Sequence, residues 1–187
     1  MTASIHPTAI VEDGAALGEG VRIGPFCHVG PHAVLAENVE LMSHVVVAGH
    51  TSVGANVKIY PFASIGHPPQ DLKYKGEPTK LTIGKNCLIR EGVTMNPGTV
   101  SGRGLTMVGD NCFFLANSHV AHDCVIGDNV VMANNVMLGG HSSIGNFTIL
   151  SGGAAVQQFV RVGPHVFTSG FAAIWRDVIP YGAVFGF

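Results

Sequence analysis

Three side chains in one short stretch of the sequence could carry out proton transfer. The segment Asn117–Val125, NSHVAHDCV, places His119, His122 and Asp123 within five residues of one another, and His141 follows soon after. A neutral imidazole accepts a proton near neutral pH, and a neighbouring carboxylate orients the ring and stabilises the cation that forms. The pattern predicts that His122 is a general base and that Asp123 is its partner. The alternative is a histidine that only makes a structural hydrogen bond in a turn.

A six-residue repeat is expected to position these side chains. When the sequence is written in sixes from Ile5, 25 of 26 first positions are apolar, where composition alone predicts roughly 12. The exception is Thr168. This period fits a parallel β-helix in which each hexad forms a short strand and a turn, and three hexads complete one coil. We therefore expect an all-β fold of about ten coils that forms a single domain over residues 1–187.

The repeat also predicts which residues lie above one another. Residues 18 positions apart occupy equivalent places on successive coils, about 4.8 Å apart. His122, Gly140 and Gln158 are the third residues of their hexads, so we expect them to form one column. Glycine above His122 presents a backbone without a side chain. This arrangement suits acyl transfer, which needs a base for a hydroxyl group and an N–H group near the developing oxyanion.

Two segments interrupt the repeat. Residues 66–82, GHPPQDLKYKGEPTKLT, are polar and contain a cluster of charges in a sequence that is otherwise poor in charge. We expect them to project from the prism as a loop that carries binding residues. Within residues 101–107, one extra residue resets the frame before the hexads resume at Val108.

Composition excludes several function classes. The net charge of −2, with only 12% charged residues, gives no basic field for nucleic acid. No apolar run reaches the roughly 20 residues of a spanning helix, so we expect no membrane insertion. The start of the sequence, MTASIHPTAIVEDG, lacks the pattern of a signal peptide. The four cysteines lack metal-type spacing and are expected to be reduced, as in a cytoplasmic protein.

Several motifs together resemble one enzyme family. The stretches SHVAHDCVIG, QDLKYKGEPT, ANNVMLGGHSSIG, AVQQFVRVG and RDVIPYG resemble the UDP-N-acetylglucosamine O-acyltransferases of lipid A synthesis. The resemblance implies a left-handed parallel β-helix and a cytoplasmic homotrimer with sites between adjacent prisms. It also implies transfer of a (3R)-3-hydroxyacyl chain from acyl carrier protein to the glucosamine 3-hydroxyl of UDP-N-acetylglucosamine. No cofactor and no metal are expected.

The resemblance further implies roles for individual residues. His122 matches the family's general base, Asp123 matches its partner, and Gly140 matches the backbone amide that stabilises the oxyanion. Gly170 matches the position that limits acyl length, where glycine would leave room for a longer chain. The positions that match substrate-contacting residues, or lie beside them, are Gln70, Asp71, Lys73, His119, His141, Gln157 and Gln158.

The sequence departs from the family pattern in three ways. Asn96 and Pro97 stand where the family usually has histidine and arginine, in MNPGT instead of IHRGT. Gln157 replaces a histidine of the substrate site, so it can form hydrogen bonds but cannot carry charge. We also expect the β-helix to lack the family's C-terminal helical domain, whose arginines would bind nucleotide phosphate and carrier protein.

Two alternatives to catalysis of acyl transfer stand beside this interpretation, the first because of the departures and the second because of the histidines. The first is a trimer that binds a nucleotide sugar, or is purely structural, with little turnover. The second is a zinc hydratase, because three imidazoles and a water molecule can form an open zinc site. Hexapeptide-repeat carbonic anhydrases use such sites, and the stretch DCVIGDNVVM resembles theirs. However, their paired histidines lie five residues apart, whereas His119 and His122 are separated by three.

Overall fold

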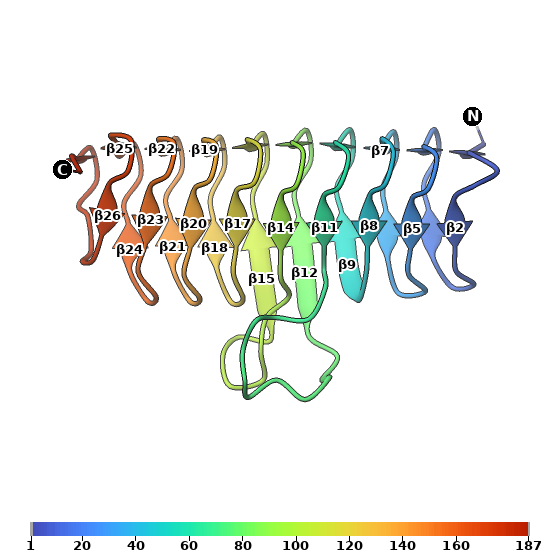
Figure 1. Ribbon diagram of the computed structural model, residues 1–187, viewed down its shortest axis with the longest axis horizontal. Helices are drawn as coiled ribbons and strands as arrows, with labels where there is room; N and C mark the ends of the chain where they lie inside the picture. Colours follow the sequence, from blue (N-terminus) through green and yellow to red (C-terminus); the bar gives the residue numbers. More distant parts are fainter. Residues whose placement is uncertain (1, 187) are drawn as a thin grey trace.

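The computed structural model describes residues 2–186, and these residues form a left-handed parallel β-helix of 27 short strands. Successive strands turn from one sheet to the next, so the molecule is a three-sided prism with the chain ends at opposite tips (Figure 1). Paired strands are parallel, and in regular coils the partners lie 18 residues apart, as in the pairing of Ser143 with Arg161. The expected period of three hexads is confirmed.

Three parallel sheets make up the sides of the prism, with ten, nine and eight strands. The ten-stranded sheet contains, in order, β1 (Ser4–Ile5), β4 (Arg22–Ile23), β7 (Glu40–Leu41), β10 (Lys58–Ile59), β13 (Leu88–Ile89), β16 (Phe113–Phe114), β19 (Val131–Met132), β22 (Ile149–Leu150), β25 (Phe167–Thr168) and β27 (Ala183–Val184). The nine-stranded sheet contains β2 (Ile10–Val11), β5 (His28–Val29), β8 (Val46–Val47), β11 (Ser64–Ile65), β14 (Thr94–Met95), β17 (His119–Val120), β20 (Met137–Leu138), β23 (Ala155–Val156) and β26 (Ala173–Ile174). The eight-stranded sheet contains β3 (Ala16–Leu17), β6 (Val34–Leu35), β9 (His50–Val53), β12 (Lys80–Ile83), β15 (Leu105–Val108), β18 (Val125–Ile126), β21 (Ser143–Ile144) and β24 (Arg161–Val162).

The first hexad positions form the core, as the repeat predicts. From Ile23 to Ile174 these positions are buried, and the small or β-branched fifth positions pack beside them. Thr168, the exception to the apolar pattern, is also fully buried. Its hydroxyl accepts a hydrogen bond from the Ser151 amide at 2.9 Å, so the polar group is satisfied inside the prism. The four cysteines are free and buried.

Turns between the strands form three edges along the prism. We call the turns from the ten-stranded to the nine-stranded sheet the first edge, and those from the nine-stranded to the eight-stranded sheet the second edge. The third residue of many turns has a positive φ angle, for example 57° at His44 and 59° at Asp123. Asparagine, aspartate and glycine tolerate this left-handed conformation better than most residues.

Both interruptions of the repeat leave the prism at the second edge (Figure 1). The first comprises residues 66–79, because β12 begins at Lys80, so the expected loop of 66–82 is three residues too long at its end. The second comprises residues 96–104, between β14 and β15. The sequence predicted one extra residue within 101–107, which is right for the shift of the six-residue frame but wrong for the size and the place of the insertion. The pairing of Thr82 with Met107 shows that seven residues beyond one coil are inserted.

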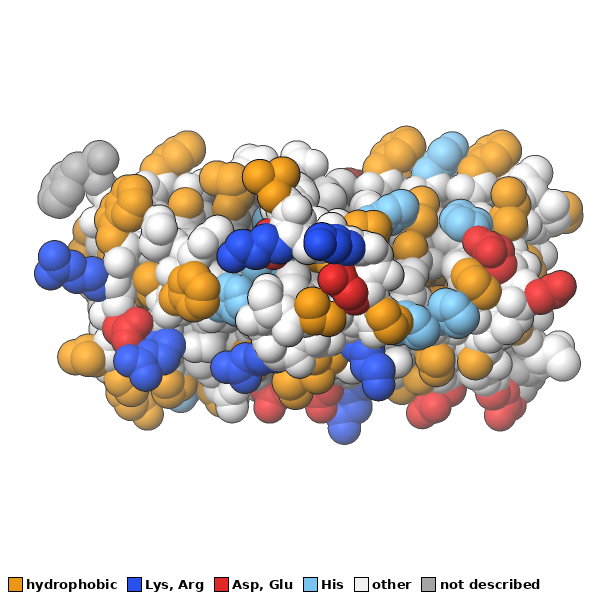
Figure 2. Space-filling model, turned by 90° about the horizontal axis from the view of Figure 1, so that it is seen from below, with side chains coloured by type: hydrophobic (Ala, Val, Ile, Leu, Met, Phe, Trp, Pro, Cys, Tyr) orange, Lys and Arg blue, Asp and Glu red, His pale blue; other side chains and the backbone are white. Residues whose placement is uncertain are grey.

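Figure 2 views the molecule from the side on which the loops project, and basic side chains gather there over its middle with an acidic one among them. In sequence, the first loop carries Asp71, Lys73, Lys75 and Glu77, and the second carries Arg103. Residues 2–186 contain no helix that is long and apolar enough to cross a bilayer. The first loop, with four charged side chains in residues 66–79, is thus richer in charge than the regular coils.

Candidate active site

His122 and Asp123 lie in the turn between β17 and β18 and are bonded to each other. His122 Nδ1 lies 2.8 Å from Asp123 Oδ2. An ionised carboxylate only accepts hydrogen bonds, so this contact places the proton of a neutral imidazole on Nδ1 and leaves Nε2 as an acceptor. The predicted pairing of a base with an orienting carboxylate is present in the structure.

Asp123 is fully buried and is surrounded by hydrogen-bond donors. Burial alone raises the pKa of a carboxyl group, but hydrogen bonds from His122 and Thr99 outweigh it, and the pKa of Asp123 is held below its ordinary value. The Arg103 amide adds a further bond of 2.7 Å to Oδ1. Asp123 is therefore a charged acceptor at neutral pH, as an orienting group for His122 must be.

Gly140 lies directly against the His122 ring. A Cβ atom at this position would lie 2.6 Å from both Nε2 and Cε1 of His122, which no real side chain could do without moving the ring. Within residues 2–186 the Gly140 amide meets no hydrogen-bond acceptor, while its carbonyl accepts from the Phe159 amide at 3.1 Å. The neighbours in the column predicted from the period of 18 are present, with the Gly140 backbone against the Nε2 side of the His122 ring.

His119 lies on the outer face of β17 and is neutral at neutral pH. Burial lowers the pKa of His119, and the positive charge that His122 can carry lowers it further. Its Nδ1 lies 2.7 Å from the Thr94 hydroxyl, the equivalent residue on the preceding coil. His119 therefore faces the site as a fixed, uncharged hydrogen-bonding group.

His141 lies one coil beyond His122. Its ring stacks on Phe159 at 4.4 Å and meets the edge of the His122 ring at 5.0 Å. His122, Asp123 and His141 each present a possible metal ligand atom within 4.8 Å of the others. This group differs from the three histidines of the zinc alternative. His122 Nδ1 is hydrogen-bonded to the Asp123 carboxylate, and His141 Nε2 lies 4.0 Å from Asp123 Oδ2, so the carboxylate brings both rings together.

Two adjoining hollows open at His122 and contain most of the predicted substrate-contacting residues. One, of about 330 Å³, includes Gln70, Asn96, His119, Gly140 and Gln158 in its lining. The other, of about 400 Å³, is lined by Gln70, Asp71, Lys73, His122, His141, Gln158 and others. The first loop thus brings three of the expected residues to the second edge, although they lie about 50 residues from His122 in the sequence.

Two predicted residues lie outside these hollows. Gln157 follows β23 and lines a neighbouring hollow of about 90 Å³ with Trp175. Gly170 follows β25 at the first edge, across the nine-stranded sheet from His122. A Cβ atom there would meet only the Gly152 carbonyl oxygen, at 3.5 Å. The structure therefore does not place Gly170 in the same hollow as His122, and the role of Gly170 in binding the acyl chain stays a prediction.

Sequence reasoning missed the residues of the second loop. Thr99 and Arg103 bond to Asp123, and Asn96 donates through Nδ2 to the carbonyls of His67 and Pro68 at 3.0 and 3.3 Å. Asn96, singled out only as a departure from the family pattern, thus ties the second loop to the base of the first. The frame shift within 101–107 was the signal that could have revealed this loop.

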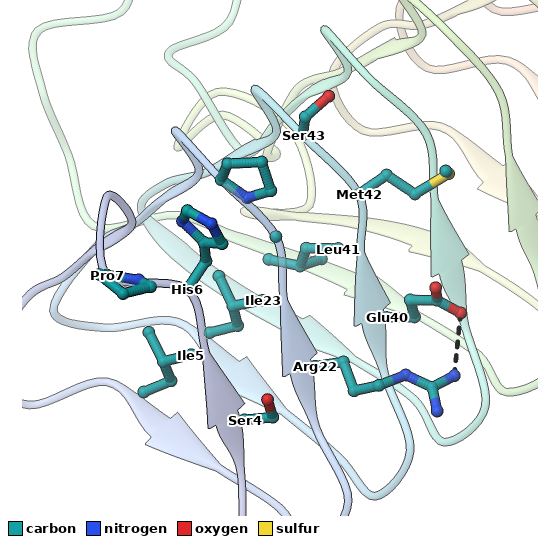
Figure 3. A pocket seen from close by; sticks show the side chains of 12 residues that line it. Ser4, Ile5, His6, Pro7, Arg22, Ile23, Glu40, Leu41, Met42 and Ser43 are labelled. Atoms are coloured by element: carbon teal, nitrogen blue, oxygen red, sulfur yellow. Dashed lines mark hydrogen bonds and ion pairs between the residues drawn. The ribbon is translucent and has the colours of Figure 1, made fainter.

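A larger hollow, of about 550 Å³, lies at the other end of the prism (Figure 3). It is lined by residues of β1, β4 and β7 and of the turns that follow them. In this hollow, the Arg22 guanidinium is hydrogen-bonded to the Glu40 carboxylate at 3.1 Å, and the His6 imidazole is hydrogen-bonded to the Thr8 hydroxyl at 3.0 Å. The lining of this hollow holds no bonded carboxylate–imidazole pair, so the smaller hollows of the second edge are the stronger candidate for the active site.

Comparison with known proteins identifies relatives of the chain. The family described as bacterial transferase hexapeptide (six repeats) matches residues 106–140. An acyl-[acyl-carrier-protein]–UDP-N-acetylglucosamine O-acyltransferase of Rhizobium etli is 60% identical over 185 residues, which cover 99% of this chain and 68% of the relative. The corresponding protein of Bartonella henselae is 56% identical over 97% of this chain and 66% of its own length.

Solved structures agree with these relatives. A UDP-N-acetylglucosamine acyltransferase superimposes with a TM-score of 0.96 at 46% identity, over 98% of this chain and 71% of that one. The UDP-N-acetylglucosamine O-acyltransferase of Moraxella catarrhalis RH4 gives a TM-score of 0.96 at 44% identity, over 97% of this chain and 71% of that one. The chain therefore belongs to the family of acyl-[acyl-carrier-protein]–UDP-N-acetylglucosamine O-acyltransferases.

Proposed function

We propose that this chain transfers a (3R)-3-hydroxyacyl group from acyl carrier protein to the 3-hydroxyl of UDP-N-acetylglucosamine, the first step of lipid A biosynthesis. The names of its relatives support the reaction. One observation carries the assignment to a site: the Nε2 side of the His122 ring lies against the Gly140 backbone, whose amide is unbonded within residues 2–186, and Nδ1 is bonded to Asp123. This arrangement provides the base and the oxyanion donor of acyl transfer together.

The reaction follows from this geometry. Nε2 of His122 takes the proton of the sugar hydroxyl while its oxygen attacks the thioester carbonyl carbon. The carbonyl oxygen becomes an oxyanion that accepts a hydrogen bond from the Gly140 amide. The tetrahedral intermediate collapses by breaking the C–S bond, and the imidazolium returns its proton to the departing thiolate. Asp123 stabilises the imidazolium and keeps the proton of the neutral ring on Nδ1.

The residues around the hollows would hold the two substrates. Asp71 and Lys73, with Gln70, provide carboxylate, ammonium and amide groups at the mouth, which suit the hydroxyls and phosphates of a nucleotide sugar. Four further residues are assigned as substrate contacts: His119, His141, Gln157 and Gln158. Gly170 would bound the acyl chain. We assign the site no metal and no cofactor.

The proposed assembly is a cytoplasmic homotrimer. Apolar side chains are exposed on the outer face of the nine-stranded sheet, including Met137 at 52%, on the strand next to β17, and Ile10 at 62%, at the far end of the sheet. Such side chains favour contact with another copy, and homo-oligomers are usually cyclic. The net charge of −2 gives no support for a nucleic-acid partner.

A transfer assay on the purified chain tests the proposal. UDP-N-acetylglucosamine is incubated with 3-hydroxyacyl carrier proteins of several chain lengths, and the 3-O-acylated product is identified by mass spectrometry. Formation of this product confirms the function. Binding of UDP-N-acetylglucosamine without product would contradict it and favour the binding trimer. Stoichiometric zinc with CO2 hydration would instead favour the hydratase.

A further inference from the structure

We propose that the second loop, residues 96–104, is a positioning device that clamps the Asp123 carboxylate and thereby fixes the His122 ring over Gly140. Thr99 and Gly102 are its positioning residues, and neither touches the reacting atoms. The inference rests on the proposed function only for its kinetic consequence, because the clamp itself can be observed without turnover.

The loop surrounds the carboxylate with directed donors. The Thr99 hydroxyl donates to Asp123 Oδ2 at 2.7 Å, and the Thr99 amide lies 3.1 Å from the same oxygen. The Arg103 amide donates to Oδ1 at 2.7 Å. Each of these bonds restrains the plane of the carboxylate, and Thr99 itself is buried. Because Oδ2 also accepts from His122 Nδ1, the restraint passes directly to the imidazole.

Gly102 allows the loop to come this close. A Cβ atom at Gly102 would lie 2.5 Å from Oδ1 and 2.6 Å from Oδ2 of Asp123. Its backbone φ angle is not in the left-handed region, so the turn itself does not require glycine. Contact with the carboxylate is therefore the reason that a side chain cannot be accommodated here.

The clamp replaces a regular feature of the prism. At the next two coils, the turn residues His141 and Phe159 donate their amides to the carbonyls of His122 and Gly140 on the preceding coil. The Asp123 amide instead donates to the Thr106 hydroxyl at 2.8 Å, because the inserted loop takes the place of the preceding turn. The insertion thus removes a backbone acceptor at this one coil and supplies donors for a buried carboxylate.

Thr99→Val tests the clamp, because valine has the same shape but lacks the hydroxyl. We expect kcat to fall about 10- to 100-fold, the usual effect of losing a hydrogen bond to a charged group, with KM unchanged. Thr99→Ser restores the hydroxyl and should recover kcat. Thr148→Val is the matched control, since it removes a buried hydroxyl that donates to the Gly163 carbonyl at 2.9 Å in a turn between the eight-stranded and ten-stranded sheets, on a different edge from His122.

A second measurement does not depend on turnover. In proton NMR of histidine-labelled protein, the hydrogen-bonded Nδ1 proton of His122 gives a downfield signal, assigned by its loss in His122→Ala. We expect Thr99→Val and Gly102→Ala to weaken or shift this signal, and Thr148→Val to leave it in place. Thermal melts identify any variant that has unfolded.

The outcomes separate the two proposals. A signal that changes in Thr99→Val and Gly102→Ala supports the clamp even if the wild-type chain transfers no acyl group, a result that would refute only the proposed function. An active wild-type chain whose Thr99→Val variant keeps both kcat and the Nδ1 signal would overturn the clamp. Equal losses of kcat in Thr99→Val and Thr148→Val, with an unchanged signal, would also overturn it.

Discussion

The first and second edges flank the same nine-stranded sheet, and both carry histidines in turns. On the first edge, His44 lies between the rings of Phe26 and Phe62, with ring centroids 5.0 Å away on each side. On the second edge, His122 contacts a buried carboxylate and a glycine backbone. The first edge keeps its regular turns at these coils, whereas the second is interrupted by both loops.

The difference shows what a repeat provides and what it leaves open. The coil places a turn residue every 18 positions on either edge, so position alone does not make a histidine a base. At His44 the neighbours in the column are aromatic rings, which stack but exchange no proton. At His122 the neighbour is the buried Asp123 carboxylate, and the second loop surrounds it with hydrogen-bond donors. The candidate active site therefore lies where the regular coil is interrupted.

The largest expected effect comes from removing the imidazole on each edge in turn. His122→Ala should lower kcat about 10³-fold, since it removes the general base. His44→Ala should keep wild-type activity, because its ring only stacks on exposed neighbours. The transfer assay measures both, with thermal melts to show that the prism is intact. Similar activities for the two variants would contradict the conclusion that the two edges differ in function.

A smaller effect is expected from adding one methyl group on each edge. Gly140→Ala places a Cβ atom where the His122 ring lies, so the ring must move, and we expect kcat to fall about 10²-fold. Gly152→Ala on the first edge meets only a carbonyl oxygen at 3.5 Å and should leave kcat unchanged. Crystal structures of both variants would show whether the imidazole has shifted. A fully active Gly140→Ala variant would argue against an oxyanion role for this backbone.

The smallest effect concerns stability in acid. Because the folded-state pKa of Asp123 lies below its ordinary value, its ionised form stabilises the fold above that ordinary value. This stabilisation is lost as the pH falls through the folded-state pKa. Urea unfolding of wild type and Asp123→Asn should therefore differ most near neutral pH, by about 2 kcal/mol, and converge in acid. A difference in unfolding free energy that stays constant with pH would show that the stabilising effect of Asp123 does not depend on its charge.

The exposed Asp177 gives a control for this measurement. It also has a lowered pKa, chiefly because the Arg161 amide and guanidinium bond to its carboxylate. Since its partners are largely exposed to solvent, Asp177→Asn should change stability less than Asp123→Asn at every pH. A larger loss of stability for Asp177→Asn would mean that the burial of Asp123 does not determine how much its carboxylate stabilises the fold.

The regular part of the molecule could be predicted from the sequence because each local signal agrees with the coil. Apolar first positions such as Ile65 and Leu138 are buried, and the period of 18 places Gly140 beside His122. The same arithmetic could not place Asp71 and Lys73, because no period connects a projecting loop to the prism. Their place at the site was expected from the family resemblance, and the hollow at His122 includes them.

The loops themselves were predicted less well, for a physical reason. The first loop inserts twelve residues beyond one coil, as the pairing of Lys58 with Leu88 shows. Twelve is a multiple of six, so the hexad frame continues through the loop as if the coil were unbroken. The second loop inserts seven residues, which leaves only one residue of frame shift visible. Thr99 therefore looked like part of a hexad and Gly102 like part of a one-residue insertion, so their contact with Asp123 could not be foreseen.

The tolerance of the coil for inserted residues has a consequence for how such a protein can change. Strand β12 pairs in register with both β9 and β15, although each connection between the coils contains extra residues. Chain length at the second edge is thus uncoupled from the geometry of the core. Loops there can be lengthened, shortened or exchanged between relatives without repacking the interior, which makes this edge a natural grafting site for new specificities.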